Sequence, residues 1–97
     1  MAADKDSDIK TVQVLDRAVK ILDVVAAGSD PVNSNRIVQE TGIHASTAHR
    51  LLWSLTELGF LEHTTENCWR LGLRFLEYGN RVRRALPVRT AAVDVMR

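Results

Sequence analysis

Apolar residues recur every three or four positions in four segments of the chain, which is the spacing of helices with one buried face. The first segment covers residues 11–28, a short second segment covers 34–41, and a longer third segment covers 45–58. The fourth covers 71–86 and stops at Pro87, because proline cannot continue a helix. The pattern therefore predicts four helices.

Two shorter segments, 60–64 and 68–71, are rich in the apolar and aromatic residues that favour strands. The polar residues 65–67 between them favour a turn, so we expect a β-hairpin with a loop of about three residues. A short helix, a turn at Gly42, a longer helix and a hairpin follow one another in this order. The order is typical of a winged helix-turn-helix, a mainly α fold with a small β-hairpin.

Composition limits the chain to one small domain with flanking segments. It has 97 residues, of which 45% are hydrophobic, enough for one modest core. Residues 1–10 are small and charged, so we expect a flexible tail before a domain over 11–72. We expect 73–97 to hold a linker helix and the start of a C-terminal domain, because a new amphipathic pattern stops at Arg97 without a cap.

The sequence contains no segment that would direct the protein into or across a membrane. The longest apolar run, from Val24 to Ala27, has four residues, against the ~20 that a transmembrane helix needs. The polar N-terminus lacks the basic and apolar regions of a secretion signal. We therefore expect a cytoplasmic protein that does not bind membranes.

Charge and motif spacing exclude several classes of function. The net charge is only +1, but nine of the ten arginines lie beyond residue 30, and a guanidinium group matches phosphate and guanine edges. The single cysteine, Cys68, excludes an intrachain disulfide, and the three histidines lack the spacing of metal ligands. No phosphate-binding glycine loop or nucleophile motif is present. We therefore predict no enzyme activity, no metal site and no cofactor.

The third predicted helix carries residues suited to reading DNA, because the second helix of such a motif places its N-terminal side chains at base edges in the major groove. The outward positions there are Ala45, Ser46, His49 and Arg50, with Thr47 at the border of this face. Two alternatives are structural. Ser46 and Thr47 could instead cap the helix. Arg50 could instead pair with Glu40 or Glu57.

The predicted hairpin is a second candidate for DNA contact, since a wing meets phosphate or the minor groove, where arginine is favoured. Arg70, His63 and Asn67 lie on or near this hairpin. The alternative for each of them is a position in a solvated loop. Trp53 follows His49 by one helical turn, and we expect it to pack against the wing or the tail rather than to contact DNA.

Three segments resemble the DNA-binding domain of the IclR family of bacterial transcription regulators: LDRAVKILDVV, TGIHASTAHRLLWSLTELGFLE and WRLGLRFLEYGNR. The resemblance covers residues 11–86, and the matching positions are Gly42, Ser46, Thr47, Arg50, Leu51, Leu52, Leu55, Gly59, Leu71 and Gly72. It implies a homodimer that binds near-palindromic operators in double-stranded DNA, and it allows higher oligomers in the full-length protein. It also implies a C-terminal domain that senses a small-molecule effector.

The chain departs from the family pattern at three positions. Proline is common in the family where His44 stands, and lysine is common where Ala45 stands, so one phosphate contact is missing. Arg36 stands where an acidic capping residue is common. We expect Arg36 to replace the missing phosphate contact.

These arguments give two groups of predicted site residues. The DNA-binding group is Ser34, Arg36, His44, Ala45, Ser46, Thr47, His49, Arg50, His63, Asn67 and Arg70. The dimerisation group lies on the first helix, whose apolar face is wider than packing on one small domain requires: Val14, Ala18, Ile21 and Val25. Two alternatives remain open: that this face lies wholly in its own core, and that the winged helix binds a protein or only dimerises, without reading DNA.

Overall fold

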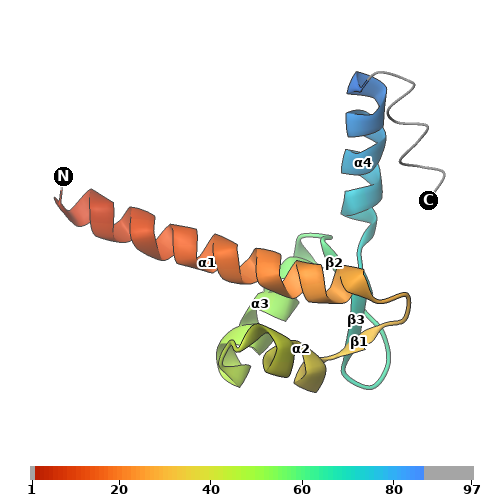
Figure 1. Cartoon of the computed structure of the whole chain (residues 1–97), viewed down its shortest axis with the longest axis horizontal. Coiled ribbons are helices and arrows are strands. Elements are labelled where there is room, and N and C mark those ends of the chain that lie inside the picture. The colour runs from red at the N-terminus through yellow and green to blue at the C-terminus, as the bar shows by residue number, and fades with distance from the viewer. Residues whose placement is uncertain (1, 87–97) are drawn as a thin grey trace.

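The computed structural model describes residues 2–86, with side chains from Val12 onward. Over these residues it contains four helices and three strands: α1 (Ala2–Ala27), β1 (Val32–Asn33), α2 (Ser34–Thr41), α3 (Ala45–Glu57), β2 (Leu61–His63), β3 (Cys68–Leu71) and α4 (Leu73–Ala85) (Figure 1). The predicted fold class is confirmed, a mainly helical winged helix-turn-helix. The predicted start of a C-terminal domain lies beyond Leu86, outside the described residues.

Helix α1 is longer than the sequence pattern predicts. It begins at Ala2, so residues 2–10 are helical where the composition predicts a flexible tail. The reason is that no glycine or proline occurs before Gly28, and that the segment starts with two alanines and carries early acidic residues, which favour a helix N-terminus. Although α1 has 26 residues, no helix in the described part of the chain is long and apolar enough to cross a membrane.

The turn between α2 and α3 is fixed by local hydrogen bonds. The Asn33 side chain caps α2 by accepting from the backbone N–H of Asn35 at 2.7 Å. Gly42 ends the helix at φ 73°, a left-handed conformation that favours glycine, and its N–H donates to the Val38 carbonyl at 2.9 Å. Both residues have the roles that the sequence predicts, and the turn sets the angle at which α3 leaves.

The wing is part of a three-stranded antiparallel sheet with the order β1-β3-β2. Strand β1 has only two residues, too few for the alternation that predicts strands, and it pairs Val32 with Trp69. Strand β2 ends at His63, so the loop to β3 covers residues 64–67, one more than predicted. Its last two residues, Glu66 and Asn67, have positive φ values of 56° and 64°.

The core lies between the C-terminal half of α1, the helix-turn-helix and the sheet. Its largest fully buried side chain is Trp69. Its members are Ile21, Val25, Val32, Ile37, Ile43, Ala48, Leu52, Leu55, Leu61 and Trp69. Two members of the predicted dimerisation group are therefore misassigned, since Ile21 is 0% and Val25 3% exposed within a single chain. They cannot form a contact with a second molecule. Ala18 is half-buried against the same core, and Val14 is exposed.

A different stripe of α1 stays open to solvent. Val12, Leu15 and Val19 are 62%, 60% and 53% exposed. Their spacing of three and four residues places them along one side of the helix. The first half of α1 also extends beyond the helix-turn-helix, as Figure 1 shows. The apolar width of this helix therefore has two causes, a core face and an exposed stripe.

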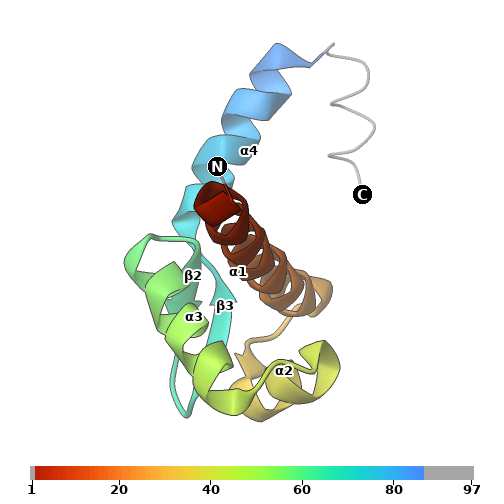
Figure 2. The same cartoon turned by 90° about the vertical axis from the view of Figure 1, so that its left-hand side faces the viewer.

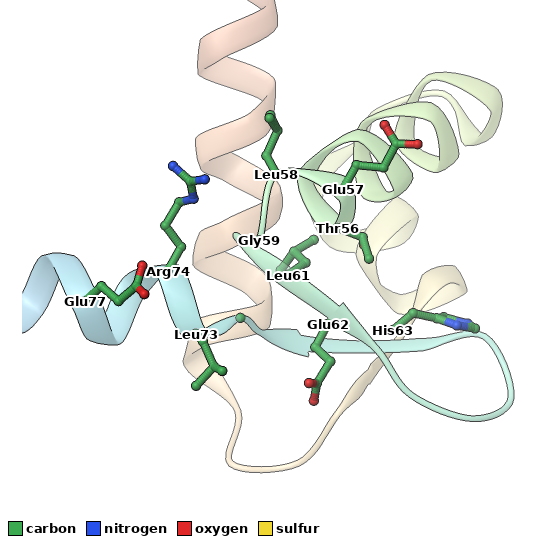
Figure 3. Close-up of a pocket in the computed structure, with 11 residues that line it drawn as sticks. Thr56, Glu57, Leu58, Gly59, Leu61, Glu62, His63, Leu73, Arg74 and Glu77 are labelled. Carbon is green, nitrogen blue, oxygen red and sulfur yellow. The ribbon is translucent and has the colours of Figure 1, made fainter.

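Helix α4 extends away from the sheet and has no buried side chain (Figure 1). Its start is fixed by a close backbone approach, in which the Gly72 N–H donates to the Phe60 carbonyl at 2.9 Å. A cleft of about 590 Å³ lies beside this junction, between the end of α3, β2 and the start of α4 (Figure 3). Its rim carries the acidic side chains of Glu57, Glu62 and Glu77.

Candidate nucleic-acid interface

The outward face of α3 is the centre of the candidate interface. Ala48 and Leu52 are 0% exposed and anchor the helix to the core. On the opposite side Ser46 and Arg50, four residues apart, are exposed. Ala45 is exposed, whereas Thr47 and His49 are half-buried at the two edges of the face. The predicted helix residues thus lie together on one exposed surface.

The N-terminus of α3 is capped by His44, not by Ser46 or Thr47. The His44 Nδ1 atom accepts from the Ser46 backbone N–H at 3.3 Å and lies 3.0 Å from the Ser46 Oγ atom. The capping alternative for Ser46 and Thr47 is therefore not supported. The Thr47 hydroxyl makes no hydrogen bond within the described residues, so it can bond to a ligand.

The charge on this face suits a polyanion. From Ala45 to Thr56, α3 contains no acidic residue, and its N-terminus carries the positive end of the helix dipole. Arg50 is exposed and forms no ion pair with Glu40 or Glu57, so that structural alternative is not supported. The guanidinium of Arg50 is therefore open to phosphate or a base edge.

Two further arginines are held by exposed ion pairs. Arg36 on α2 pairs with Glu40 one turn later, and Arg70 on β3 pairs with Glu62 directly across the sheet. All four side chains are about half exposed. Exposed pairs of this kind contribute roughly 0–1 kcal/mol, so either arginine can exchange its carboxylate for a phosphate at small cost.

The predicted contact from Ser34 is corrected by the structure, because this residue is 1% exposed. Its Oγ atom accepts a hydrogen bond from the Asn67 side-chain amide, and its backbone N–H donates to the Asn67 carbonyl at 3.1 Å. These bonds tie the wing loop to the start of α2. Ser34 is therefore a structural residue, and the Asn67 amide is engaged with it rather than open to a ligand.

An aromatic cluster joins α3 to the wing, as predicted for Trp53. The Trp53 ring lies 4.7 Å from the His63 ring and 5.5 Å from the Trp69 ring, measured between centroids. His49 meets the Trp69 ring edge-on, with the centroids 6.2 Å apart. Figure 2 shows α3 and the β2–β3 loop on the same side of the molecule. The cluster thus fixes the wing next to the exposed face of α3.

The other polar features of the structure do not compete with this face as a site. The cleft in Figure 3 has an acidic rim and lies at the far end of α3, so it is unsuited to DNA. Among the side chains described, those of residues 12–86, no three from histidine, cysteine or acidic residues come together in a group that could hold a metal ion.

Comparisons with known proteins agree with this geometry. Residues 14–65 match the model of the IclR helix-turn-helix domain. The chain is similar to the HTH-type transcriptional regulator KipR of Bacillus subtilis, with 39% identity over 62 residues, 64% of this chain and 25% of KipR.

Solved structures show the same fold. The crystal structure of the Agobacterium tumefaciens repressor BlcR aligns with a TM-score of 0.72 at 32% identity, over 80% of this chain and 32% of that one. An IclR homologue from Microbacterium hydrocarbonoxydans, complexed with 4-hydroxybenzoate, aligns with a TM-score of 0.62 at 26% identity. The alignment covers 73% of this chain and 32% of that one. The chain therefore spans only about a third of these structures and a quarter of KipR.

The family model covers more than half of the chain and includes α2, α3 and β2. The chain belongs to the IclR family of transcriptional regulators and contains the helix-turn-helix DNA-binding domain of that family.

Proposed function

We propose that this chain binds near-palindromic operators in double-stranded DNA as a homodimer and thereby controls transcription. The observation that carries the proposal is the outward face of α3, which is polar, free of acidic residues and flanked by the wing. A helix of this kind fits the major groove, where each base pair presents a distinct pattern of donors and acceptors.

Base reading is assigned to the first two turns of α3. Ser46 and Thr47 bring hydroxyl groups that can bond to several bases, and His49 brings a ring nitrogen. Ala45 is short enough to let the helix N-terminus approach the groove closely. His44 caps the helix and is exposed beside it, so it can also reach the backbone.

Phosphate contacts are assigned to the arginines around this face. Arg50 has no competing ion pair among the residues whose side chains are described, and Arg36 on α2 and Arg70 on the wing are held only by exposed pairs. Such contacts are independent of sequence and supply most of the salt dependence of binding. Arg36 would supply the phosphate contact that is lost because Ala45 stands where the family commonly has lysine.

The homodimer is assigned to the exposed stripe of Val12, Leu15 and Val19 on α1. Val14 lies on the side of α1 that carries Ile21 and Val25, seven and eleven residues later, and Ala18 is half-buried, so neither belongs to this stripe. This replaces the predicted group that included Ile21 and Val25. Helix α4 offers a second exposed apolar surface, with Leu73 73% and Leu76 60% exposed. Two-fold symmetry would place the two α3 helices over half-sites at a fixed spacing.

The full-length protein is proposed to act in the cytoplasm as a ligand-responsive regulator, without enzyme activity of its own. The support is that an IclR homologue was crystallised with 4-hydroxybenzoate, a small organic acid, and is about three times as long as the part this chain matches. We assign the effector to a domain beyond this chain and leave its identity open. Higher oligomers remain compatible with such a protein.

The test is selection from random duplex DNA by this 97-residue chain at a stated salt concentration. We expect enrichment of a two-fold symmetric motif by the natural chain. The double variant Ser46→Ala/Thr47→Ala should lose the motif but keep salt-dependent binding to any duplex. A matched control, Ser29→Ala, removes an exposed hydroxyl outside α3 and the wing and should leave the enriched motif unchanged. Absence of any enriched motif in the natural chain would contradict the proposal and favour a protein-interaction module.

A further inference from the structure

A cleft of about 360 Å³ lies between the middle of α1 and the turn that joins α2 to α3. Helix α1 packs against both helices of the motif, and Figure 1 shows it passing above them. The α1 wall of the cleft carries Gln13, Arg17 and Lys20, and the opposite wall ends at Thr47 in the first turn of α3. Of the described residues that line this cleft, only Ile43 has an apolar side chain. The cleft is therefore polar, and it differs from the cleft at the start of α4 in having cations on its wall.

The polar flank of α1 is distinct from the two apolar sides of the same helix. Gln13, Arg17 and Lys20 are spaced by four and three residues, so they share one side, and all three are exposed. With about 3.6 residues per turn, this side lies between the core face at Ile21 and the exposed apolar stripe that includes Val19. Neither the core nor the proposed dimer therefore accounts for the charges on this flank.

The cationic groups of this flank are available to a ligand. Arg17 forms no ion pair with an acidic side chain among residues 12–86. Lys20 pairs with Asp16 at 3.4 Å, and both side chains are more than half exposed. Exposed pairs of this kind add little stability, so Lys20 can exchange Asp16 for another anion at small cost. Two cations against one carboxylate leave the α1 wall of the cleft with a net positive charge.

The wall opposite α1 supplies a further hydrogen-bond donor. The Thr47 hydroxyl has no partner among residues 12–86, and the residue is half-buried at the edge of the cleft. The Thr41 hydroxyl, by contrast, donates to the Ile37 carbonyl at 2.7 Å and accepts from the Ile43 N–H at 3.2 Å. These two bonds fix the turn, so the cleft holds unused donors on two walls whose relative positions are set by the fold.

The size and the chemistry of the cleft select a small anion. Its volume is near the lower end of the range for ligand sites, about 300–1,000 Å³. A guanidinium group binds two oxygens of a phosphate or a carboxylate at once, and an ammonium or a hydroxyl group binds one. A double helix is too wide to enter a cleft of this size, so a free molecule is needed to reach the donors on both walls.

We propose that this cleft binds a small organic oxyanion with at least two negative charges, such as a phosphate monoester, and that the bound anion weakens DNA binding. Arg17 and Lys20 hold the charged oxygens, and Thr47 donates a hydrogen bond from α3. The site lies in the DNA-binding domain itself and is separate from the effector site assigned to a domain beyond this chain. The regulatory part of the inference rests on the proposed DNA-binding function, whereas the ligand site does not.

The effect on DNA binding follows from two residues that the cleft shares with the proposed DNA-binding surface. His44 and Thr47 line the cleft and also belong to the group assigned to DNA. A bound anion occupies the Thr47 hydroxyl and places negative charge beside the groups that approach the DNA phosphates. Coupling between two binding sites is reciprocal, so DNA also lowers the affinity for the anion by the same factor.

The first experiment measures the ligand site without DNA. Phosphoglycolate, a small phosphate monoester, is titrated into the ¹⁵N-labelled 97-residue chain, with sodium chloride of equal ionic strength as the blank. We expect saturable shifts of the amide NMR signals of Arg17, Gly42 and Thr47, with half-saturation at about 1 mM. Arg17→Gln should raise the dissociation constant at least about fivefold. The matched control Arg81→Gln changes an exposed arginine of α4 outside the cleft and should bind the anion as the natural chain does.

The second experiment measures fluorescence anisotropy with the selected operator duplex, in about 10 mM phosphoglycolate and in sodium chloride of equal ionic strength. We expect the anion to weaken operator binding by the natural chain and by Arg81→Gln about three- to tenfold. Arg17→Gln should lose this response. Its affinity in chloride should stay within about twofold of that of Arg81→Gln, because both variants carry the same net charge. Thermal unfolding of each variant verifies that the fold is retained.

The two experiments separate the possible failures. Absence of saturable shifts, or shifts that Arg17→Gln leaves unchanged, would overturn the ligand site. Saturable shifts with an unchanged operator affinity would overturn its regulatory role. If Arg17→Gln binds the operator in chloride far more weakly than Arg81→Gln does, the cleft serves the DNA backbone and the inference is wrong. If the natural chain binds no duplex, the proposed function itself fails, while the titration without DNA still tests the ligand site.

Discussion

Single hydrogen bonds decide whether a polar residue of this domain serves the fold or the DNA. Ser34 is the clearest case, because its hydroxyl is buried and accepts from the Asn67 amide of the wing loop. Asn67 itself adopts a left-handed conformation, with φ at 64°, which asparagine tolerates better than most residues. The wing therefore owes part of its position to a residue that precedes α2.

Replacing Ser34 with alanine tests this role. The Asn67 amide would lose its protein partner, but it is close to water, so we expect a loss of about 0.5–1.5 kcal/mol of unfolding free energy. Urea denaturation measures the difference. Ser54→Ala, at an exposed position of α3, serves as the control and should change stability by less than about 0.5 kcal/mol. Equal midpoints for both variants would show that the Ser34 bond is not stabilising.

The sequence predicts a residue's role well when the partner is close along the chain. Asn33 as a cap and Gly42 as a helix end depend on groups two and four positions away, and both predictions are confirmed. Ser34 depends on a side chain 33 positions away, and its burial cannot be inferred from local pattern. Arg70 likewise pairs across the hairpin with Glu62, whereas the Arg36–Glu40 pair joins two residues four positions apart on α2 and is local.

At the scale of elements, the junction between α3 and α4 is set by two glycines. Gly59 follows α3 with φ at 88°, and its carbonyl accepts from the Arg74 N–H at 3.2 Å. A Cβ atom on Gly72 would lie 2.2 Å from the same carbonyl oxygen, far inside contact distance. Gly72 is thus required by a close backbone approach, and not by its own φ of −89°.

The contrast between two glycines gives a matched pair of predictions. Gly72→Ala forces the backbones apart, and we expect a loss of about 1–3 kcal/mol in unfolding free energy. Gly79→Ala lies in α4 with no atom within 4 Å of its new Cβ, and we expect a gain of about 0.5–1 kcal/mol from helix propensity. Thermal unfolding of both variants measures the difference. A Gly72→Ala chain as stable as the natural one would contradict the close approach.

Elements with strong local signals are predicted nearly to the residue, and weak ones are missed. The helices α2 and α3 fall within one residue of their predicted ends. Strand β1 is missed because two residues cannot show an alternation. The start of α1 is misjudged because a polar composition says little about helix formation when no breaker is present.

At the scale of the molecule, the exposed stripe of α1 predicts self-association. Leu15→Lys/Val19→Lys introduces charge at positions that do not contribute to the core. We expect the fold to persist and the dissociation constant of the dimer to rise by at least about tenfold. Sedimentation velocity over a range of concentrations measures the shift.

The control for this experiment is Gln13→Lys, which adds a charge at an exposed polar position of the same helix and should leave the dimer intact. Loss of the dimer in both chains would indicate a general charge effect. Persistence of the dimer in the Leu15→Lys/Val19→Lys chain would assign the interface elsewhere, for example to Leu73 and Leu76 on α4.

Two apolar stripes on one helix explain why the predicted dimerisation group is partly misassigned. Periodicity shows that both sides of α1 are apolar, but only the position of the helix over the core tells which side is used inside one chain. The burial of Ile21 and Val25 comes from contacts with residues that lie far along the sequence. The outward face of α3 is easier to predict, because it lies within a single helix.

The sheet has a consequence for how this domain forms. Strand β1 at Val32 pairs with Trp69, and Trp69 is also the largest side chain of the core. The segment that matches the family model ends at residue 65, before β3, the strand that carries Trp69, begins. During synthesis the helix-turn-helix therefore emerges with a gap in its centre and an unpaired strand beside it. The recognisable motif is smaller than the unit that folds, and a protein engineer who transplants it should cut after β3.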